Sequence, residues 1–208
     1  MPINPNKYKN IIFDLGNVIL NIDYVLTAKA FKELGLNTFE VQFSQSQQQQ
    51  LFDAYEKGET TSVEFRNELR TYCKEGTTDH SIDNAWNTML LDLPKARLDL
   101  LNRLKKTHRI FLLSNTNEIH INAFHNYLLQ SFKIVDLSGY FEKMYLSYKI
   151  GMRKPDAEIF EFVLKDNALN PKETLFIDDS IQHIEAAQNI GIEAYWLDVK
   201  KESVLDLF

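Results

Sequence analysis

The sequence predicts an α/β fold, built on a mostly parallel sheet and interrupted by one helical insertion. Three observations lead to this prediction. Short apolar runs alternate with longer amphipathic runs, as in strands that are connected by helices. The apolar runs are continuous, which is typical of strands covered by helices on both faces. The alternation stops after the first apolar run, over residues 21–94, and then resumes.

Five apolar runs are predicted as strands. In chain order they span residues 9–13, 109–113, 143–146, 174–177 and 193–197. The spacing of apolar side chains predicts helices between them. These helices span residues 95–106, 156–164 and 180–190. Asp156 is expected to cap the second of them, and Gly191 is expected to end the third.

The insertion contains helix-like segments and no convincing strand. The predicted helices span residues 24–34, 39–57, 61–74 and 80–91. Large apolar side chains at helical spacing are expected to form a small core of its own. They are Trp86, Met89, Phe31, Phe39, Phe43, Phe52 and Phe65. The sequence therefore predicts a core domain of residues 1–20 and 95–208 and an all-helical cap domain of residues 21–94.

The composition excludes several classes of function. The 208 residues include 23 Lys and Arg against 29 Asp and Glu, a net charge of −6 without a basic run. This balance disfavours nucleic acid and anionic membranes as partners. Cys73 is the only cysteine, so there is no internal disulfide and no cysteine-based metal site. Without an apolar leader or a run of ~20 apolar residues, a cytoplasmic protein is expected.

Polar residues follow three of the predicted strands at the point where each strand ends. They are Asp14, then Ser114 and Asn115, then Asp178 and Asp179. In open α/β sheets, ligands bind at the carboxyl ends of the strands. A single aspartate after a strand is more often a turn former or a helix cap. Several such positions in successive strands favour a functional site.

The chemistry of these side chains explains the combination. Three carboxylates in one cleft repel each other unless a cation lies among them, and oxygen ligands favour Mg²⁺. A carboxylate beside Mg²⁺ can attack phosphorus and form an aspartyl-phosphate. Lys154, which precedes a predicted helix, would hold that carboxylate and the phosphoryl oxygens, and the Ser114 hydroxyl would donate a hydrogen bond to them. The metal and the lysine would neutralise the charge of the transition state.

Four segments in this order resemble the motifs of the haloacid dehalogenase (HAD) superfamily, most of whose members are Mg²⁺-dependent phosphatases. They are IIFDLGNV, FLLSNTN, GMRKPD and LFIDDS, and they span residues 11–180. The insertion lies where that family has a helical cap. The resemblance implies a Rossmann-like core whose first strand is central, between the strands that end at Ser114 and Asp178.

The resemblance also implies a metal site. Asp14 would be both the nucleophile and a ligand of Mg²⁺. The remaining protein ligands would be the backbone carbonyl of Gly16 and the carboxylates of Asp178 and Asp179.

A phosphate site is implied beside the metal. Ser114 and Lys154 would bind the transferred phosphoryl group, and Asn115 would contact phosphate or substrate. The expected function is Mg²⁺-dependent hydrolysis of a small phosphorylated metabolite, such as a sugar phosphate, by a monomer or homodimer.

The chain departs from the family pattern at Gly16, where many HAD phosphatases have a second aspartate that acts as general acid and base. Loss of such a group typically costs ~10²–10⁴-fold in rate. The DLGNV form resembles a branch that includes α-glucose-1-phosphate phosphatases, so activity is still expected. Asp23 is a candidate substitute acid, although capping of the first inserted helix is the favoured role.

Two other functions stay open on the sequence. A 2-haloacid dehalogenase needs no general acid, but the Asp178–Asp179 pair would repel a haloacid carboxylate. A weakly active or inactive protein that binds a phosphorylated ligand or a partner is disfavoured by the intact Asp14 and Lys154. His183 follows the acidic pair by one helical turn and is expected to be a surface residue of a helix.

Overall fold

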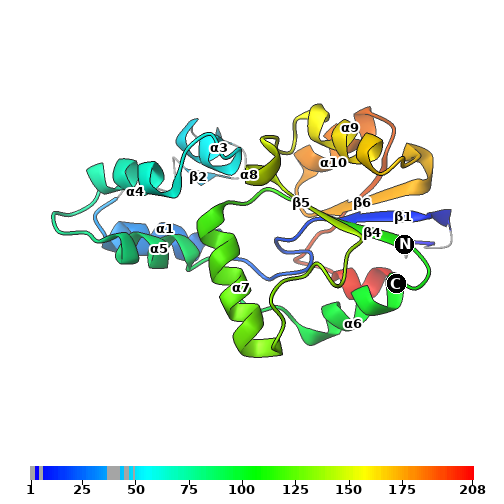
Figure 1. Cartoon of the computed structure of the whole chain (residues 1–208), viewed down its shortest axis with the longest axis horizontal. Helices are drawn as coiled ribbons and strands as arrows, with labels where there is room; N and C mark the ends of the chain where they lie inside the picture. Colours follow the sequence, from blue (N-terminus) through cyan, green and yellow to red (C-terminus); the bar gives the residue numbers. More distant parts are fainter. Residues whose placement is uncertain (1–2, 5–6, 37–42, 45–46, 49) are drawn as a thin grey trace.

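A five-stranded parallel sheet lies at the centre of the computed structural model, which describes residues 3–4, 7–36, 43–44, 47–48 and 50–208 (Figure 1). The strands are β1 (Asn10–Phe13), β4 (Arg109–Ser114), β5 (Lys143–Leu146), β6 (Thr174–Asp178) and β7 (Glu193–Trp196). Their order in the sheet is β5-β4-β1-β6-β7, and every neighbouring pair is parallel. The predicted α/β class and the central position of the first strand are confirmed.

Helices cover both faces of this sheet, which explains the continuous apolar runs. On one face, Ile11 and Phe13 pack against α6 (Lys95–Leu104), α7 (Glu118–Phe132) and the short 3₁₀ helix η3 (Val204–Leu207). On the other face, Ile12 packs against α9 (Ala157–Asp166) and α10 (Ile181–Asn189). Successive side chains of a strand point to opposite faces, so strands buried on both faces are apolar at every position.

The helix α7 was not among the predicted helices. Its apolar residues do not form a single stripe, because the helix packs against two different clusters. Ile119 belongs to the apolar cluster of the insertion, whereas Ile121, Phe124 and Leu128 belong to that of the sheet. A helix buried on two sides lacks the one-sided periodicity that predicts helices. No helix in the described part of the chain has the length and apolarity that crossing a membrane requires.

Where the structure describes it, the insertion consists mainly of four short helices. They are α1 (Tyr24–Glu33), α3 (Gln50–Glu56), α4 (Ser62–Thr71) and α5 (Asp79–Asn87). The predicted small core is present: Phe31, Phe52, Phe65 and Trp86 are buried in one cluster. Its rings meet at centroid distances of 5.1–6.3 Å around the indole of Trp86. Phe39 and the side chain of Phe43 lie outside the described residues.

The predicted helix over residues 39–57 is wrong in its first part. Phe43–Ser44 (β2) and Gln47–Gln48 (β3) pair as a short antiparallel ladder, and the helix begins only at Gln50. The insertion is therefore not wholly helical. Residues 37–42, 45–46 and 49 of that prediction lie outside the described residues. Glutamine is a good helix former, so the run of glutamines carried no local signal for this pairing.

The helix ends show which local predictions hold. The Asp23 carboxylate accepts a hydrogen bond from the Val25 amide at 2.9 Å and caps α1, as favoured. Gly191 follows the end of α10 with a φ of +86°, where glycine is favoured. Asp156 precedes α9 but makes no side-chain capping bond, which corrects the expectation. Its carboxylate lies 3.2 Å from Nζ of Lys57 in the insertion.

The insertion and the α/β part are in close contact beside β5. The short helix α8 (Ser147–Ile150) follows β5 directly and packs against α3. Gly58 lies at this contact with a φ of +70°, and a Cβ there would be 2.2 Å from the backbone oxygen of Tyr148. Only glycine fits such an approach. Arg153, in the following loop, pairs with Asp53 at 2.9 Å and with Glu56 at 3.0 Å on α3.

Candidate active site

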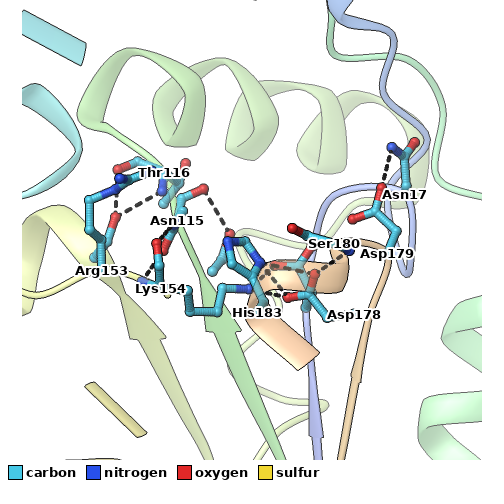
Figure 2. A network of polar contacts seen from close by, with 12 residues as sticks. Asn17, Asn115, Thr116, Arg153, Lys154, Asp178, Asp179, Ser180 and His183 are labelled. Carbon is cyan, nitrogen blue, oxygen red and sulfur yellow. Dashed lines mark hydrogen bonds and ion pairs between the residues drawn. The ribbon is translucent and has the colours of Figure 1, made fainter. Parts of the chain in front are cut away.

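The strand ends bring the predicted site residues into one cluster (Figure 2). Asp14 follows β1, Asp178 ends β6, and Lys154 lies in the loop between α8 and α9. Nζ of Lys154 donates to Oδ1 of Asp14 at 2.6 Å and to Oδ2 of Asp178 at 2.7 Å. The lysine is fully buried, so its charge is balanced by these two carboxylates. The first, third and fourth sequence motifs thus meet at one ammonium group.

Burial and charge pull the pKa values of this cluster apart. Desolvation raises the pKa of Asp14 to about 7, although Lys154 opposes the shift. Desolvation would also raise the pKa of Asp178, but Lys154 and His183 outweigh it and hold the value at about 2. Burial would lower the pKa of Lys154, and the two aspartates reverse this effect, so that it is raised. The lysine therefore stays charged at neutral pH.

The three carboxylates fit a hard divalent cation. One oxygen each from Asp14, Asp178 and Asp179 lies within 4.8 Å of the others. Three carboxylates and the Lys154 ammonium carry a formal charge of −3 + 1 = −2, which a dication neutralises. Carboxylate oxygens are the ligands that Mg²⁺ prefers. Burial raises the pKa of Asp179 to about 6, and Nδ2 of Asn17 donates to its Oδ2 at 2.9 Å.

Gly16 lies beside this cluster, two residues after Asp14. Its carbonyl accepts a hydrogen bond from the Val18 amide at 2.7 Å, which leaves one lone pair for a metal. A Cβ at this position would be 2.8 Å from Cδ1 of Ile22. The side chain of Ile22 therefore occupies the space that a residue at position 16 would need. Because Cδ1 is the far end of a flexible side chain, a larger residue at position 16 would require a shift of Ile22.

Asn115 has a role that the sequence did not suggest. Its Nδ2 donates to the backbone oxygen of Lys154 at 2.8 Å, and its Oδ1 accepts from the backbone nitrogen of Lys154 at 2.9 Å. The two bonds hold the lysine loop against the end of β4. Ser114, which ends β4, is buried and lies next to this pair. The predicted contacts of Ser114 and Asn115 with substrate stay predictions.

His183 is a member of the site that sequence reasoning placed on the surface. Its Nδ1 lies 3.0 Å from both carboxylate oxygens of Asp178, and its side chain is only 16% exposed. The residue lies in the first turn of α10, which begins directly after the strand that carries Asp178. A helix that starts so close to a strand end can turn a side chain back over it. The short spacing between Asp178 and His183 in the sequence was the signal that could have predicted this contact.

A cavity of about 60 Å³ adjoins the cluster. Its lining includes Gly16, Ser114 and Asn115 from the strand ends. The insertion contributes Tyr24, Glu56, Trp86 and Met89, and α7 contributes His120 and Phe124. The cavity therefore lies between the carboxylate and lysine cluster, the insertion and α7.

Burial shifts the pKa values of three side chains in this lining. Desolvation raises the pKa of Glu56 to about 7, against the opposing charge of Arg153. Desolvation lowers the pKa of His120 to about 3, so its imidazole is neutral at physiological pH. Burial also raises the pKa of the Tyr24 phenol well above its usual value. The cavity lining thus carries a few polar side chains among apolar ones.

Comparison with known proteins agrees with this fold and cluster. Residues 8–191 match the family model of haloacid dehalogenase-like hydrolases. The chain is 34% identical over 187 residues to D-ribitol-5-phosphate phosphatase from Bacteroides thetaiotaomicron, covering 90% of each chain. It is 28% identical to a sesquiterpene phosphatase from Aspergillus oryzae, covering 89% of this chain and 87% of the other.

A solved structure extends the likeness to three dimensions. An aspartate-to-alanine mutant of a HAD family enzyme from Bacteroides thetaiotaomicron, crystallised with magnesium and inorganic phosphate, superimposes with a TM-score of 0.87. The two sequences are 38% identical, and the match covers 94% of this chain and 96% of the other. The fold and the carboxylate–lysine cluster define a hydrolase with an α/β core. The protein belongs to the haloacid dehalogenase-like hydrolase family.

Proposed function

We propose that the protein is a Mg²⁺-dependent phosphatase that hydrolyses a small phosphate monoester, such as a sugar phosphate. The observation that carries the proposal is the buried Lys154 ammonium shared by Asp14 and Asp178, beside a third carboxylate. The relatives add support, because one is named for ribitol 5-phosphate and another was crystallised with magnesium and phosphate. The finer assignment to an α-glucose-1-phosphate phosphatase-like branch rests on the DLGNV sequence alone.

In the proposed mechanism, Asp14 attacks the phosphorus atom. The bond between phosphorus and the ester oxygen breaks, and the alcohol leaves with a proton taken from water. A water molecule then hydrolyses the resulting aspartyl-phosphate, which releases phosphate and restores the Asp14 carboxylate. Asp14, Asp178, Asp179 and the carbonyl of Gly16 would hold Mg²⁺, which supplies positive charge next to the phosphoryl oxygens. Positive charge at this position would stabilise the negative charge that develops in the transition state. Such electrostatic stabilisation is usually a large part of catalysis.

The remaining residues bind and orient the phosphoryl group. The Lys154 ammonium lies 2.6 Å from the attacking carboxylate and balances charge on the phosphoryl oxygens. The Ser114 hydroxyl donates a hydrogen bond to one of those oxygens. Asn115 acts as a positioning residue, since both of its amide atoms bind the backbone of Lys154.

The division into two domains is part of this proposal. Residues 1–20 and 95–208 form the core domain with the reacting groups, and residues 21–94 form the cap domain. Two separate apolar clusters support the division, although Ile119 of α7 packs with the cap. Closure of the cap excludes bulk water and limits the size of the substrate.

Two other functions are less compatible with the cluster. A haloacid carries its own carboxylate, and the formal charge of −2 around Lys154 repels it unless a cation is bound. A protein that only binds a phosphorylated ligand has no need for a carboxylate held 2.6 Å from the lysine. Neither alternative is favoured by a specific contact.

The test is a hydrolysis assay with p-nitrophenyl phosphate, run with Mg²⁺ and again with excess EDTA. Phosphate release that requires Mg²⁺ and returns when the metal is restored is the expected result. Chloride release from 2-chloropropionate without metal would instead establish a dehalogenase. Binding of inorganic phosphate in calorimetry without any turnover would leave a ligand-binding protein.

A further inference from the structure

Two polar atoms of the cavity lining have no protein partner in the described part of the chain. Oε2 of Glu56 accepts from Arg153 at 3.0 Å, while Oε1 pairs with no described residue. Nδ1 of His120 lies 2.9 Å from Oδ1 of Asn87. An amide oxygen only accepts, so Nδ1 carries the proton and Nε2 keeps a lone pair. Nε2 likewise pairs with no described residue.

These two side chains are mostly buried, and contacts with neighbouring residues hold them in place. Glu56 and His120 are each 9% exposed, and both line the cavity. The ring of His120 stacks on Trp86 with centroids 4.8 Å apart and planes 8° from parallel. A ligand that displaces water from a polar atom without pairing with it loses free energy, so both atoms favour a ligand that can form hydrogen bonds.

The cavity adjoins the phosphate site and is small. It includes Ser114 and Asn115 in its lining, so the ester group of a bound phosphate would face it. A volume of about 60 Å³ holds roughly four water molecules. A short chain with hydroxyl groups satisfies both polar atoms. An alkyl chain, whether as short as pentyl or as long as farnesyl, satisfies neither.

We propose that Glu56 and His120 bind hydroxyl groups of the leaving alcohol, so that the enzyme selects phosphate monoesters of short polyhydroxylated chains. The inference rests on the proposed function, because it assigns the specificity of the same site. A hydroxyl both donates and accepts, so it pairs with Oε1 of Glu56 whether or not the carboxyl group is protonated. Nε2 of His120 accepts a second hydroxyl. The apolar wall of Trp86 and Met89 contacts the carbon chain.

The first test compares D-ribitol 5-phosphate with n-pentyl phosphate, which has the same chain length and no hydroxyl groups. With Mg²⁺ present, we expect kcat/KM to be at least about tenfold higher for the polyol phosphate, because a buried acceptor left unpaired is costly. Farnesyl phosphate is the third substrate, and we expect it to be hydrolysed least efficiently.

Variants of His120 locate the origin of this preference. In His120→Asn the amide replaces Nδ1 and keeps the contact with Asn87, but the cavity acceptor is lost. In His120→Gln the longer side chain returns a polar atom to the position of Nε2. The preference for ribitol 5-phosphate over pentyl phosphate should fall about 10-fold or more in the first variant and recover in the second. If the preference falls equally in both variants, or falls in neither, the assigned role is contradicted.

A matched pair of variants tests Glu56. Glu56 and Asp53 both pair with Arg153, but only Glu56 lines the cavity. Glu56→Met should reduce the same preference about 10-fold or more, whereas Asp53→Asn should retain it. If Asp53→Asn reproduces the loss, the effect comes through Arg153 and the proposed contact is wrong.

The failure of this inference differs from the failure of the proposed function. If no phosphate ester, including p-nitrophenyl phosphate, is hydrolysed with Mg²⁺, the proposed function fails. If esters are hydrolysed but pentyl or farnesyl phosphate equals the polyol phosphate, only the hydroxyl selection fails. The wild-type comparison decides this even if a variant does not fold.

Discussion

The sheet and the insertion contribute differently to the same site. The sheet brings together Asp14, Lys154 and Asp178, which are separated by up to 164 positions in the chain. The insertion supplies none of these groups and contributes side chains such as Tyr24 and Glu56 to the adjoining cavity. In the proposed mechanism the reacting groups thus lie at one edge of the sheet, and the proposed selecting groups Glu56 and His120 lie on α3 and α7. This arrangement allows the substrate to change without disturbing the chemistry.

Several contacts join the two regions, so how far each depends on the other is testable. Arg153 pairs with Asp53 and Glu56 across the contact, and Ile119 of α7 packs into the cluster of the insertion. Trp86 also binds α7, because its indole nitrogen donates to Oδ1 of Asn117 at 3.2 Å. The following predictions test how independent the two regions are, beginning with the largest effect.

Truncation of a buried ring in each region should give the largest loss of stability. Phe111 in the sheet and Phe65 in the insertion are both fully buried. Phe111→Ala should lower the free energy of global unfolding by about 3–5 kcal/mol, measured by urea denaturation. Phe65→Ala should chiefly speed amide hydrogen exchange in α3, α4 and α5, with β1 still protected. Equal loss of protection in β1 would show that the two regions unfold as one unit.

Removal of the buried Lys154 ammonium should reduce activity, whereas removal of an exposed lysine ammonium should not. Lys154→Met leaves the carboxylates of Asp14 and Asp178 without their shared cation. We expect kcat for p-nitrophenyl phosphate to fall about 10²–10³-fold, as when one preorganised donor is lost. The control is Lys149→Met, an exposed lysine of α8, which should keep wild-type turnover. Near-normal turnover in Lys154→Met would remove the lysine from the mechanism.

Acid should destabilise the protein through His120. Desolvation lowers the pKa of His120 in the folded state to about 3, whereas the unfolded value is ~6.5. Between these values the unfolded state binds the extra proton, so stability falls as pH decreases below 6.5, by about 1.4 kcal/mol per pH unit. His120→Gln should show a shallower slope in urea denaturation between pH 7 and 5. Identical slopes would contradict a buried neutral imidazole.

The smallest effect on stability is expected at the N-terminal cap of α1, the first helix of the insertion. Asp23 accepts the Val25 amide hydrogen bond, so Asp23→Ala should cost about 1 kcal/mol of stability, while Asp23→Asn keeps the cap. The rates of Asp23→Asn on esters with good and poor leaving groups should change equally. A selective loss on poor leaving groups would make Asp23 the general acid that Gly16 does not provide.

The sequence was most informative where structure is local. The strands are continuous apolar runs, and each predicted strand agrees with the structure within one residue at its ends. Asp14 and Asp178 lie at strand ends, and Lys154 precedes a predicted helix, so all three could be found without a structure. The helix α7 could not be found, because it is buried on two sides and shows no single apolar face.

The remaining features depend on contacts between distant segments. The pairing of Asn115 with the backbone of Lys154, and that of His183 with Asp178, arise only when the loops meet. The acceptors of Glu56 and His120 face one cavity because α3 and α7 converge there. No spacing in the sequence links positions 56 and 120, so a pattern of residues could not reveal them.

The most direct test of the central claim is the activity of Asp14→Asn. The claim is that the carboxylate after β1 is the nucleophile, held by Lys154 at 2.6 Å. The variant is assayed on p-nitrophenyl phosphate with saturating Mg²⁺, beside the exposed-surface control Asp99→Asn, and folding is checked by circular dichroism. We predict that Asp14→Asn loses at least ~10³-fold in kcat and that Asp99→Asn keeps wild-type turnover. A folded Asp14→Asn variant with turnover within tenfold of wild type would contradict the account.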